Sequence, residues 1–377
     1  MADRIDFAAL ANPAIRSLQA YDPGHDIPSL RLAFANKNGL LELGSNENCY
    51  GPSPHIQIGL QAELDGLFRY PDPSGKALKA AIADKFHVPP ECIALGNGSH
   101  ELLMQFAQVF AGPDDEILVS RYCFAVYPIA AHAVGAQLKV VEAFDLQHGM
   151  PLGHNLNALL AGITAKTKLI FFANPNNPTG TWFSFTQLSD FLAAVPENVL
   201  VVVDEAYIEY ANNPEIQSAL ALVKKYSNLI VTRTFSKAYG LAGLRVGFAI
   251  ADASIVQLLE PIRESFNVNH IALHAARLAL SDETHIANVR ANNAIERDWL
   301  ASQLAAMGLQ ALPSQTNFLL VPFGEKTPQI EKALFERGVM VRPMAGYGLG
   351  HFLRVTLSTR ADNQRFVSTL QEVMACL

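Results

Sequence analysis

The sequence predicts an α/β fold with a large, mostly parallel sheet, followed by a smaller α+β unit. Short apolar runs such as residues 169–173 and 199–203 alternate with segments of helical periodicity. This alternation is typical of parallel strands covered by helices on both faces. Half of the 377 residues are hydrophobic, which is enough to build a substantial core. Ligands of such folds bind beyond the carboxyl ends of the strands, so polar residues at those ends are the first candidates for a site.

The first two thirds of the chain contain most of the predicted elements. Residues 1–45 are rich in turns and are expected to form an arm laid over the body. Helical periodicity and flanking Gly or Pro residues predict helices at residues 54–67, 76–86, 101–110, 127–134 and 186–194. Apolar runs predict strands at residues 92–95, 116–119, 137–141, 169–173, 199–203 and 228–231.

The pattern changes after about residue 281. A long charged helix at residues 285–307 leads to strands at 315–321, 339–342 and 352–357 and to helices at 327–337 and 363–374. We therefore predict three parts. These are an arm that also contributes to the small domain at 1–45, a large ligand-binding domain at 46–284, and a small C-terminal domain at 285–377.

Composition argues against several classes of partner. The net charge of −7 gives no electrostatic basis for binding nucleic acid or an anionic membrane. The four cysteines are scattered without ligand spacing, which indicates reduced thiols. The acidic residues in the first ten positions are unlike a signal peptide, and no apolar run approaches the roughly 18 residues of a membrane span. A soluble cytoplasmic protein is expected.

The segment VTRTFSKAYGLAGLRVGFA, residues 231–249, is the strongest candidate for chemistry. Thr234, Ser236, Lys237 and Arg245 follow a predicted strand within a few residues. Hydroxyls and a guanidinium suit a phosphate, whereas a desolvated lysine amine forms Schiff bases with carbonyls. A site for both a phosphate and an aldehyde predicts pyridoxal 5′-phosphate (PLP). The alternative is an ordinary basic surface loop.

Two further polar residues lie beyond predicted strands. Asp204 ends the run VLVVVD, where a carboxylate is costly to bury without a partner. It is expected to pair with a pyridinium nitrogen, or else to cap a helix. Tyr207 either donates to the phenolic oxygen of PLP or packs in the core. Asn177, in the loop NPNNPTG, either donates to the same oxygen or only shapes the turn.

Two segments before residue 130 offer ligand-binding groups. Gly98 and Ser99, between a strand and a helix, form a plausible phosphate cradle, although a tight turn needs the same residues. Phe124 either stacks on an aromatic ligand or packs in the core, and Tyr127 either lines the pocket or packs as well; an aromatic residue in an α/β core is more often a packing residue.

Two arginines and two histidines complete the candidates. Arg354 lies inside the apolar strand HFLRVTL and needs an anionic partner, either a substrate carboxylate or phosphate or an internal acid. Arg342 has the same alternatives. His270 and His274 are four residues apart and share a helix face. We expect no metal there, because no acidic residue with ligand spacing lies nearby.

The motifs together resemble those of the fold-type I PLP-dependent aminotransferases. GNGS, NPNNPTG, DEAY, TFSKAYGLAGLRVG and LRVT occur in that family's order, and the resemblance runs from about Tyr21 to Arg354 and beyond. It implies that Lys237 forms the Schiff base with PLP and shuttles the proton. It also implies that Asp204 pairs with the ring nitrogen, that Tyr207 and Asn177 hold the phenolic oxygen, and that Arg354 holds the substrate carboxylate.

The resemblance assigns the remaining residues as well. The phosphate would be bound by Gly98, Ser99, His100, Thr234, Ser236 and Arg245. Phe124 would stack on the ring. Tyr70, in RYPDP, resembles the tyrosine that reaches the phosphate of the neighbouring subunit, which implies a homodimer.

Details of the motifs are similar to the histidinol-phosphate aminotransferase branch of this family. AYDPG at Tyr21, SNENCYGPSP, GNGSHELL and VRPMAGYG carry this resemblance. It implies transamination between L-histidinol phosphate and 2-oxoglutarate, giving imidazole-acetol phosphate and glutamate in histidine biosynthesis. Tyr21, Asn177, Arg342 and Arg354 would bind substrate. The chain departs from the branch at Cys49, His100 and Phe124, where Pro, Asp and often Tyr are usual.

Three alternatives remain open at this point. An aromatic amino acid aminotransferase would keep the chemistry and the 2-oxoglutarate partner. A PLP-dependent decarboxylase of a phosphorylated amino acid would share most motifs. A PLP-sensing regulator would carry an N-terminal DNA-binding module. Here only about 20 residues precede Tyr21, and this segment has no excess of basic residues, which argues against such a module.

Overall fold

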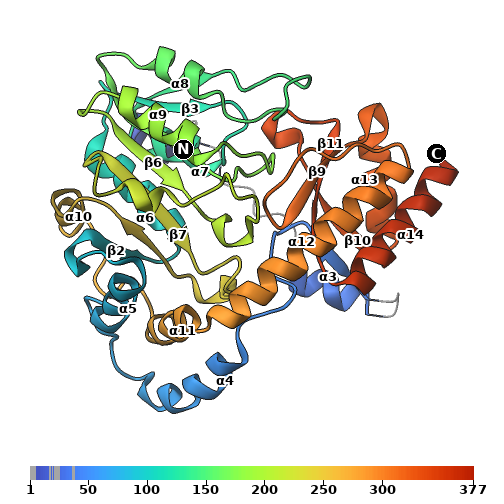
Figure 1. Ribbon diagram of the computed structural model, residues 1–377, viewed down its shortest axis with the longest axis horizontal. Helices are drawn as coiled ribbons and strands as arrows, with labels where there is room; N and C mark the ends of the chain where they lie inside the picture. The colour runs from blue at the N-terminus through green and yellow to red at the C-terminus, as the bar shows by residue number, and fades with distance from the viewer. Residues whose placement is uncertain (1–5, 17, 19, 21–25, 36–38) are drawn as a thin grey trace, which may run out of the picture.

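The fold is built around two β-sheets. The computed structural model describes residues 6–16, 18, 20, 26–35 and 39–377. A seven-stranded sheet and a four-stranded sheet lie side by side, and the long helix α12 (Glu283–Ala306) leads from one to the other (Figure 1). The predicted α/β class is therefore confirmed.

The larger sheet has the strand order β2-β8-β7-β6-β5-β3-β4. Its strands are β2 (Ile93–Gly96), β3 (Glu116–Ser120), β4 (Gln137–Val141), β5 (Thr167–Ala173), β6 (Leu200–Asp204), β7 (Leu229–Thr234) and β8 (Gly247–Ile250). Six of them run in one direction, and β8 runs antiparallel to its neighbours β2 and β7. The carboxyl ends of β5, β6 and β7 therefore meet at one edge.

Helices cover both faces of this sheet. Successive side chains of a strand point to opposite faces, so Phe171 packs toward one layer of helices and Phe172 toward the other. The first layer contains α6 (Ser99–Phe110), α7 (Val126–Ala133) and α10 (Ala253–Leu259). The second contains α8 (Leu156–Gly162) and α9 (Phe185–Ala194), with α5 (Lys76–Phe86) and α11 (His270–Ser281) over β2 and β8. This burial explains the unbroken apolar runs in the sequence.

The smaller sheet combines the C-terminal region with one strand from the N-terminal region. β1 (Leu41–Leu43) pairs in parallel with β10 (Val339–Pro343), and β11 (Phe352–Thr356) and β9 (Phe318–Pro322) follow in antiparallel order. α12, α13 (Thr327–Glu336) and α14 (Arg360–Cys376) share a hydrophobic core with these strands. The domain boundaries at residues 45 and 284 stay a prediction. The smaller sheet is consistent with them, because its strands come only from residues before 45 and after 284.

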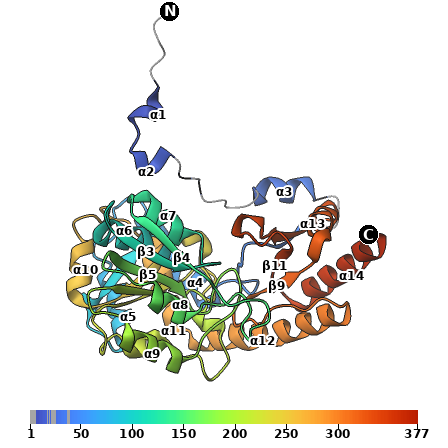
Figure 2. The ribbon, with the colours of Figure 1, turned by 90° about the horizontal axis from the view of Figure 1, so that it is seen from above.

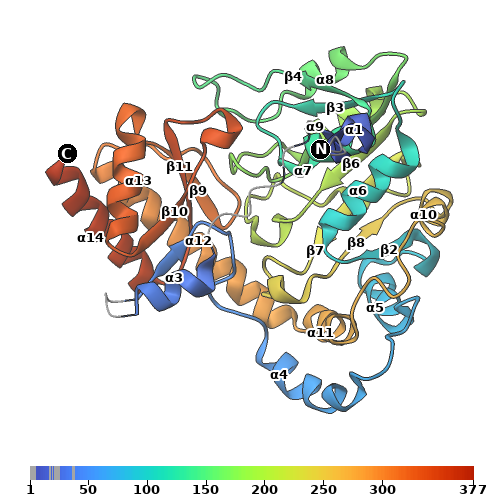
Figure 3. The same cartoon turned by 180° about the vertical axis from the view of Figure 1, so that it is seen from behind.

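The N-terminal segments differ in how they contact the body. α1 (Phe7–Leu10) and α2 (Pro13–Arg16) project from it, with α2 next to α7 (Figure 2). α3 (Ile27–Ala33) lies beside the smaller sheet (Figure 3), where Phe34 meets Phe335 edge to face at 5.6 Å.

Residues 54–67, predicted as one helix, form two short elements. α4 (Pro54–Leu60) ends at a 3₁₀ helix, η1 (Gln61–Gly66). The prediction of one continuous helix was wrong. Gly59 and Gly66 explain the break, because glycine weakens an α-helix. The other 3₁₀ helices are η2 (Pro90–Cys92), η3 (Ile208–Tyr210), η4 (Ala219–Leu222), η5 (Ala242–Leu244), η6 (Gly324–Lys326) and η7 (Ala345–Tyr347). Among the described helices, none is both long and apolar enough to cross a bilayer.

Candidate active site

A cavity of about 210 Å³ lies beyond the carboxyl ends of β6 and β7. It brings together residues that the sequence places up to 309 positions apart, from Ser45 to Arg354. The predicted site residues that line it are Ser99, His100, Phe124, Asn177, Asp204, Tyr207, Thr234, Ser236, Lys237, Arg245 and Arg354. Ser45, Asn46, Ala173 and Ala206 line it as well. The roles of these residues stay predictions, whereas their proximity is a feature of the fold.

A larger cavity of about 650 Å³ lies next to α8 and α9. Its described lining includes Trp182, Asp190 and Glu215 but neither lysine nor arginine. It therefore lacks an amine that could react with a carbonyl and a permanent cation that could hold a phosphate. The smaller cavity is the candidate active site because its lining contains both a lysine amine and arginine guanidinium groups, although its volume is smaller.

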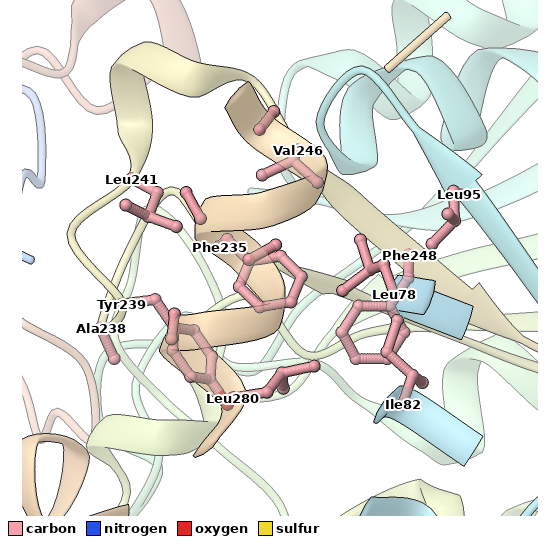
Figure 4. Close-up of a cluster of buried hydrophobic side chains, with 14 of the residues drawn as sticks. Leu78, Ile82, Leu95, Phe235, Ala238, Tyr239, Leu241, Val246, Phe248 and Leu280 are labelled. Carbon is pink, nitrogen blue, oxygen red and sulfur yellow. The ribbon is translucent and has the colours of Figure 1, made fainter. Parts of the chain in front are cut away.

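Lys237 lies in the loop between β7 and β8. Apolar side chains of this loop are buried in the hydrophobic core and hold the loop in place. The neighbouring Phe235, Tyr239 and Leu241 are buried in a cluster with Phe248 (Figure 4). The Lys237 Nζ atom donates to the backbone oxygens of Ser45 and Asn46, at 3.3 and 3.2 Å.

The surroundings of Lys237 favour its neutral form. Burial lowers the pKa of Lys237 to about 8, and the positive charge of Arg354 acts in the same direction. With this pKa, roughly a tenth of the amine is neutral at pH 7, far more than for an unperturbed lysine. A neutral amine can act as a nucleophile and as a base.

Asp204 ends β6, with its side chain on the sheet face that α7 covers. Its Oδ2 atom accepts a hydrogen bond from the Tyr127 hydroxyl at 3.0 Å. Its Oδ1 atom is buried and has no hydrogen-bond partner among the described residues. Burial raises the pKa of Asp204 to about 6, although the bond from Tyr127 opposes the rise. The site thus holds a carboxylate with one acceptor oxygen to offer to a cationic ligand.

Anion-binding groups gather at the start of α6. Arg245 donates from Nη1 to the Ser236 hydroxyl at 3.0 Å, and the Ser236 backbone N–H donates to Thr234 Oγ1 at 3.1 Å. A Cβ atom on Gly98 would lie 2.6 Å from Arg245 Nη2 and would displace the guanidinium, and the φ of 81° at Gly98 is one that L side chains rarely adopt. Ser99 begins α6, whose unpaired N–H groups favour an anion.

Arg354 links the smaller sheet to the NPNNPTG loop. Its Nη1 atom donates to Asn177 Oδ1 at 2.6 Å, and its Nη2 atom donates to the backbone oxygen of Gly44 at 2.7 Å. These two partners are a neutral amide and a neutral carbonyl group, so neither of these bonds neutralises the guanidinium.

Asn46 is a site residue that sequence reasoning missed. Its Nδ2 atom donates to the Tyr207 hydroxyl at 3.0 Å, and its Oδ1 atom accepts from Thr356 Oγ1 at 3.1 Å. Asn46 has a φ of 56°, which Asn tolerates better than most residues. The Asn-rich loop SNEN indicated that this backbone could adopt a positive φ. It did not indicate the hydrogen-bond partners Tyr207 and Thr356, because they lie 161 and 310 positions away in the sequence.

The residues with a predicted role in the site that are not among those lining the cavity are Gly98, Tyr127, Tyr70, Arg342 and Tyr21. Tyr70 is 81% exposed and stacks on Phe266 with ring centroids 4.5 Å apart. Arg342 is paired with Arg354 across β10 and β11, so both side chains leave the same face of the smaller sheet. Tyr21 lies outside the described residues.

The prediction that His270 and His274 lack an acidic neighbour is wrong. The Glu63 carboxylate contacts both rings, at 2.9 Å from His270 Nε2 and 3.0 Å from His274 Nδ1. Glu63 is more than 200 positions away in sequence, so spacing alone could not reveal the contact.

Comparisons with known proteins agree with this geometry. The family described as "Aminotransferase class I and II" matches residues 38–370. The chain is 44% identical to histidinol-phosphate aminotransferase 2 of Pseudomonas fluorescens (strain Pf0-1), over 98% of this chain and 99% of that protein. It is 42% identical to histidinol-phosphate aminotransferase 1 of Mannheimia succiniciproducens, with the same coverage.

A solved structure with the same fold contains a cofactor. Histidinol-phosphate aminotransferase from Sinorhizobium meliloti, in complex with pyridoxal-5′-phosphate, superimposes with a TM-score of 0.85 at 28% identity, over 97% of this chain and 98% of that one. The predicted resemblance and the fold-type I architecture are thus confirmed. This chain belongs to the aminotransferase class I and II family.

Proposed function

We propose that this chain binds PLP in the 210 Å³ cavity and transfers an amino group from L-histidinol phosphate to 2-oxoglutarate. The products are imidazole-acetol phosphate and glutamate, as in histidine biosynthesis. One observation carries the proposal. Lys237, Asp204 and Arg245 line a single cavity in a chain that is 44% identical to a histidinol-phosphate aminotransferase over nearly its whole length.

The residues present fit the cofactor. The buried Oδ1 atom of Asp204 needs a donor, and a protonated ring nitrogen would supply both the hydrogen bond and the compensating charge. Gly98, Ser99, Ser236 and Arg245 would hold the phosphate, and Phe124 would lie against the ring. Tyr207, kept in place by Asn46, and Asn177 would hold the phenolic oxygen. When bound, PLP supplies an electron sink that stabilises negative charge at the substrate α-carbon.

The residues of the chain do the remaining work. Lys237 would hold the cofactor aldehyde until the substrate amine displaces it, and its freed Nζ atom would then accept and return the proton that moves during transamination. Its lowered pKa suits this exchange, because a base works best when its pKa is close to the working pH. Asp204 would keep the ring nitrogen protonated, and Tyr127 would stabilise the Asp204 carboxylate through its hydroxyl.

The paired arginines support a doubly anionic substrate. Arg342 and Arg354 are direct partners across antiparallel strands, so both side chains leave one face of the sheet and would offer two cationic groups to an anionic substrate. Histidinol phosphate offers a phosphate and 2-oxoglutarate offers carboxylates, so the same arginines would serve both half-reactions.

A homodimer is part of the proposal. Ile58, Leu67, Phe68 and Tyr70 are between 57% and 81% exposed, although they are large apolar residues. They lie close together in sequence around η1, and exposed apolar side chains in one region mark an interaction surface. A second copy covering this surface would also place Tyr70 near the neighbouring phosphate site. Sedimentation equilibrium of the purified chain tests this part.

The deciding experiment is a steady-state assay of the PLP-loaded protein. Histidinol phosphate and 2-oxoglutarate are supplied, and glutamate formation is measured. Turnover should be lost in Lys237→Ala, while far-UV circular dichroism and the melting temperature show that the variant is folded. Substantial residual turnover would move the proton-transfer role away from Lys237.

The same assay separates the alternatives. Turnover with phenylalanine or tyrosine but not with histidinol phosphate would keep the enzyme class and replace the substrate. Release of carbon dioxide without 2-oxoglutarate would indicate a decarboxylase. Absence of turnover with all of these substrates, in a protein that holds PLP, would end the proposal.

A further inference from the structure

A cluster of one carboxylate and two imidazoles lies away from the candidate active site. Glu63 belongs to η1, and His270 and His274 lie one turn apart at the beginning of α11. Glu63 Oε2 is 2.9 Å from His270 Nε2, and Glu63 Oε1 is 3.0 Å from His274 Nδ1. The two rings have centroids 4.6 Å apart. All three side chains are partly buried, so their positions are constrained by packing.

This set of atoms suits a metal ion. Each residue offers one ligand atom, and these atoms lie within 4.8 Å of one another. Two imidazole nitrogens and one carboxylate oxygen form a common zinc ligand set, with bonds of about 2.0–2.2 Å and an open fourth position. A cavity of about 240 Å³ is lined by His270, His274 and Gly66, so water has room to fill that position.

We propose that Glu63, His270 and His274 bind a divalent transition-metal ion of the zinc type, and that the ion fixes η1 against α11. The ion would replace one hydrogen bond, between His270 and Glu63, and one close contact, between His274 and Glu63, by three coordinate bonds.

Charges around the cluster define its selectivity. Arg69, Arg277 and Asp72 line the same cavity, and the two positive charges outnumber the one negative charge, so the lining does not attract cations as a class. Binding must therefore come from imidazole coordination, which favours Zn²⁺, Co²⁺ or Ni²⁺. Mg²⁺ and Ca²⁺ prefer oxygen ligands and are not expected to bind here.

The proposed ion would order the segment that follows η1. Phe68 and Tyr70 are 79% and 81% exposed and lie within seven residues of Glu63. Tyr70 contacts the body by stacking on Phe266. A second attachment at Glu63 would restrict the motion of the chain between these two points.

The test uses untagged, PLP-loaded protein from which metal has been removed with a chelator. Co²⁺ and Zn²⁺ are titrated against a chromophoric competitor, and Co²⁺ is also followed by its visible absorption. His270→Gln and His274→Gln keep a hydrogen-bonding side chain but remove the ligand. Glu63→Gln tests the carboxylate, and His132→Gln, an exposed histidine on α7, is the matched control.

We expect one equivalent of metal in the wild-type protein and in His132→Gln. Each variant of the cluster should lose more than the roughly tenfold in affinity that an outer-shell change costs. Hydrogen exchange of residues 61–66 should slow when metal is added, independently of activity. Equal binding in all variants, or binding of Mg²⁺ as tight as that of Zn²⁺, would overturn the metal site. Specific binding without slower exchange would overturn the fixing of η1.

Discussion

Asp204→Asn is expected to stabilise the cofactor-free protein and to weaken cofactor binding at the same time. The substitution preserves shape and the oxygen that can accept from Tyr127, but it removes the buried charge. In the apoprotein, Asp204 Oδ1 has no partner among the described residues, so its ionised form is costly. With PLP bound, the same charge would be paired with the ring nitrogen.

The magnitude follows from the shifted pKa. A rise from 3.8 to about 6 corresponds to roughly 3 kcal/mol at about 1.4 kcal/mol per pKa unit. Because the folded state holds the proton more tightly, this group favours folding at low pH, and the contribution is lost as the pH rises through about 6. The variant should therefore gain up to about 3 kcal/mol over the wild type at pH 7.5, and about half of that at pH 5.

Thermal unfolding of the two apoproteins at one protein concentration measures this difference. For a chain of 377 residues, about 3 kcal/mol corresponds to a rise of about 4 °C in melting temperature. Asp114→Asn, in an exposed loop, is the control and should change the melting temperature little. Equilibrium dialysis of PLP should show a roughly 10- to 100-fold loss of affinity in Asp204→Asn, since hydrogen bonds between charged groups are worth about 1.5–3 kcal/mol.

Two results would refute the reasoning. An Asp204→Asn apoprotein that is less stable than the wild type at pH 7.5 would mean that the carboxylate is not destabilising. Unchanged PLP affinity would mean that Asp204 does not pair with the ring nitrogen.

Three further outcomes are expected. Arg354→Ala should raise KM for both anionic substrates by roughly 10- to 100-fold, because two charge-assisted bonds are lost; an unchanged KM would remove Arg354 from the substrate site. PLP uptake by the apoprotein should accelerate about tenfold per pH unit up to about pH 8 and then level off, because only the neutral Lys237 amine reacts; a flat rate from pH 6 to 9 would contradict this. Gly98→Ala should weaken inorganic phosphate and PLP binding, because its Cβ would lie 2.6 Å from Arg245 Nη2. Gly243→Ala, where a Cβ meets nothing within 4 Å, should bind normally.

Local patterns predicted most of the large sheet. The helix at residues 76–86 and the strand at 137–141 agree with α5 and β4 at both ends. Strands such as β5 and β6 were placed within two residues, because burial on both faces selects unbroken apolar runs. β1, α8, β8 and α10 were missed, since they are short or lie in segments without a clear period.

Partners across the fold could not be predicted. Tyr127 and Asp204 are 77 positions apart, and their hydrogen bond exists because α7 packs on the sheet face to which Asp204 points. Glu63 meets His270 and His274 only because η1 packs on α11. Periodicity records which face of an element is buried, but it contains no information on which element covers it.

The sequence by itself determined the fold class and the family, and it predicted most of the side chains that the cavity brings together. It did so because strand ends, turn residues and motifs are local, and the ends of parallel strands meet at one edge. Only the tertiary structure decided the environment of those side chains. The lowered pKa of Lys237, the unpaired oxygen of Asp204 and the position of Asn46 against Tyr207 all depend on burial and on contacts between distant segments. Reactivity is set by these surroundings, and the surroundings exist only once the chain has packed.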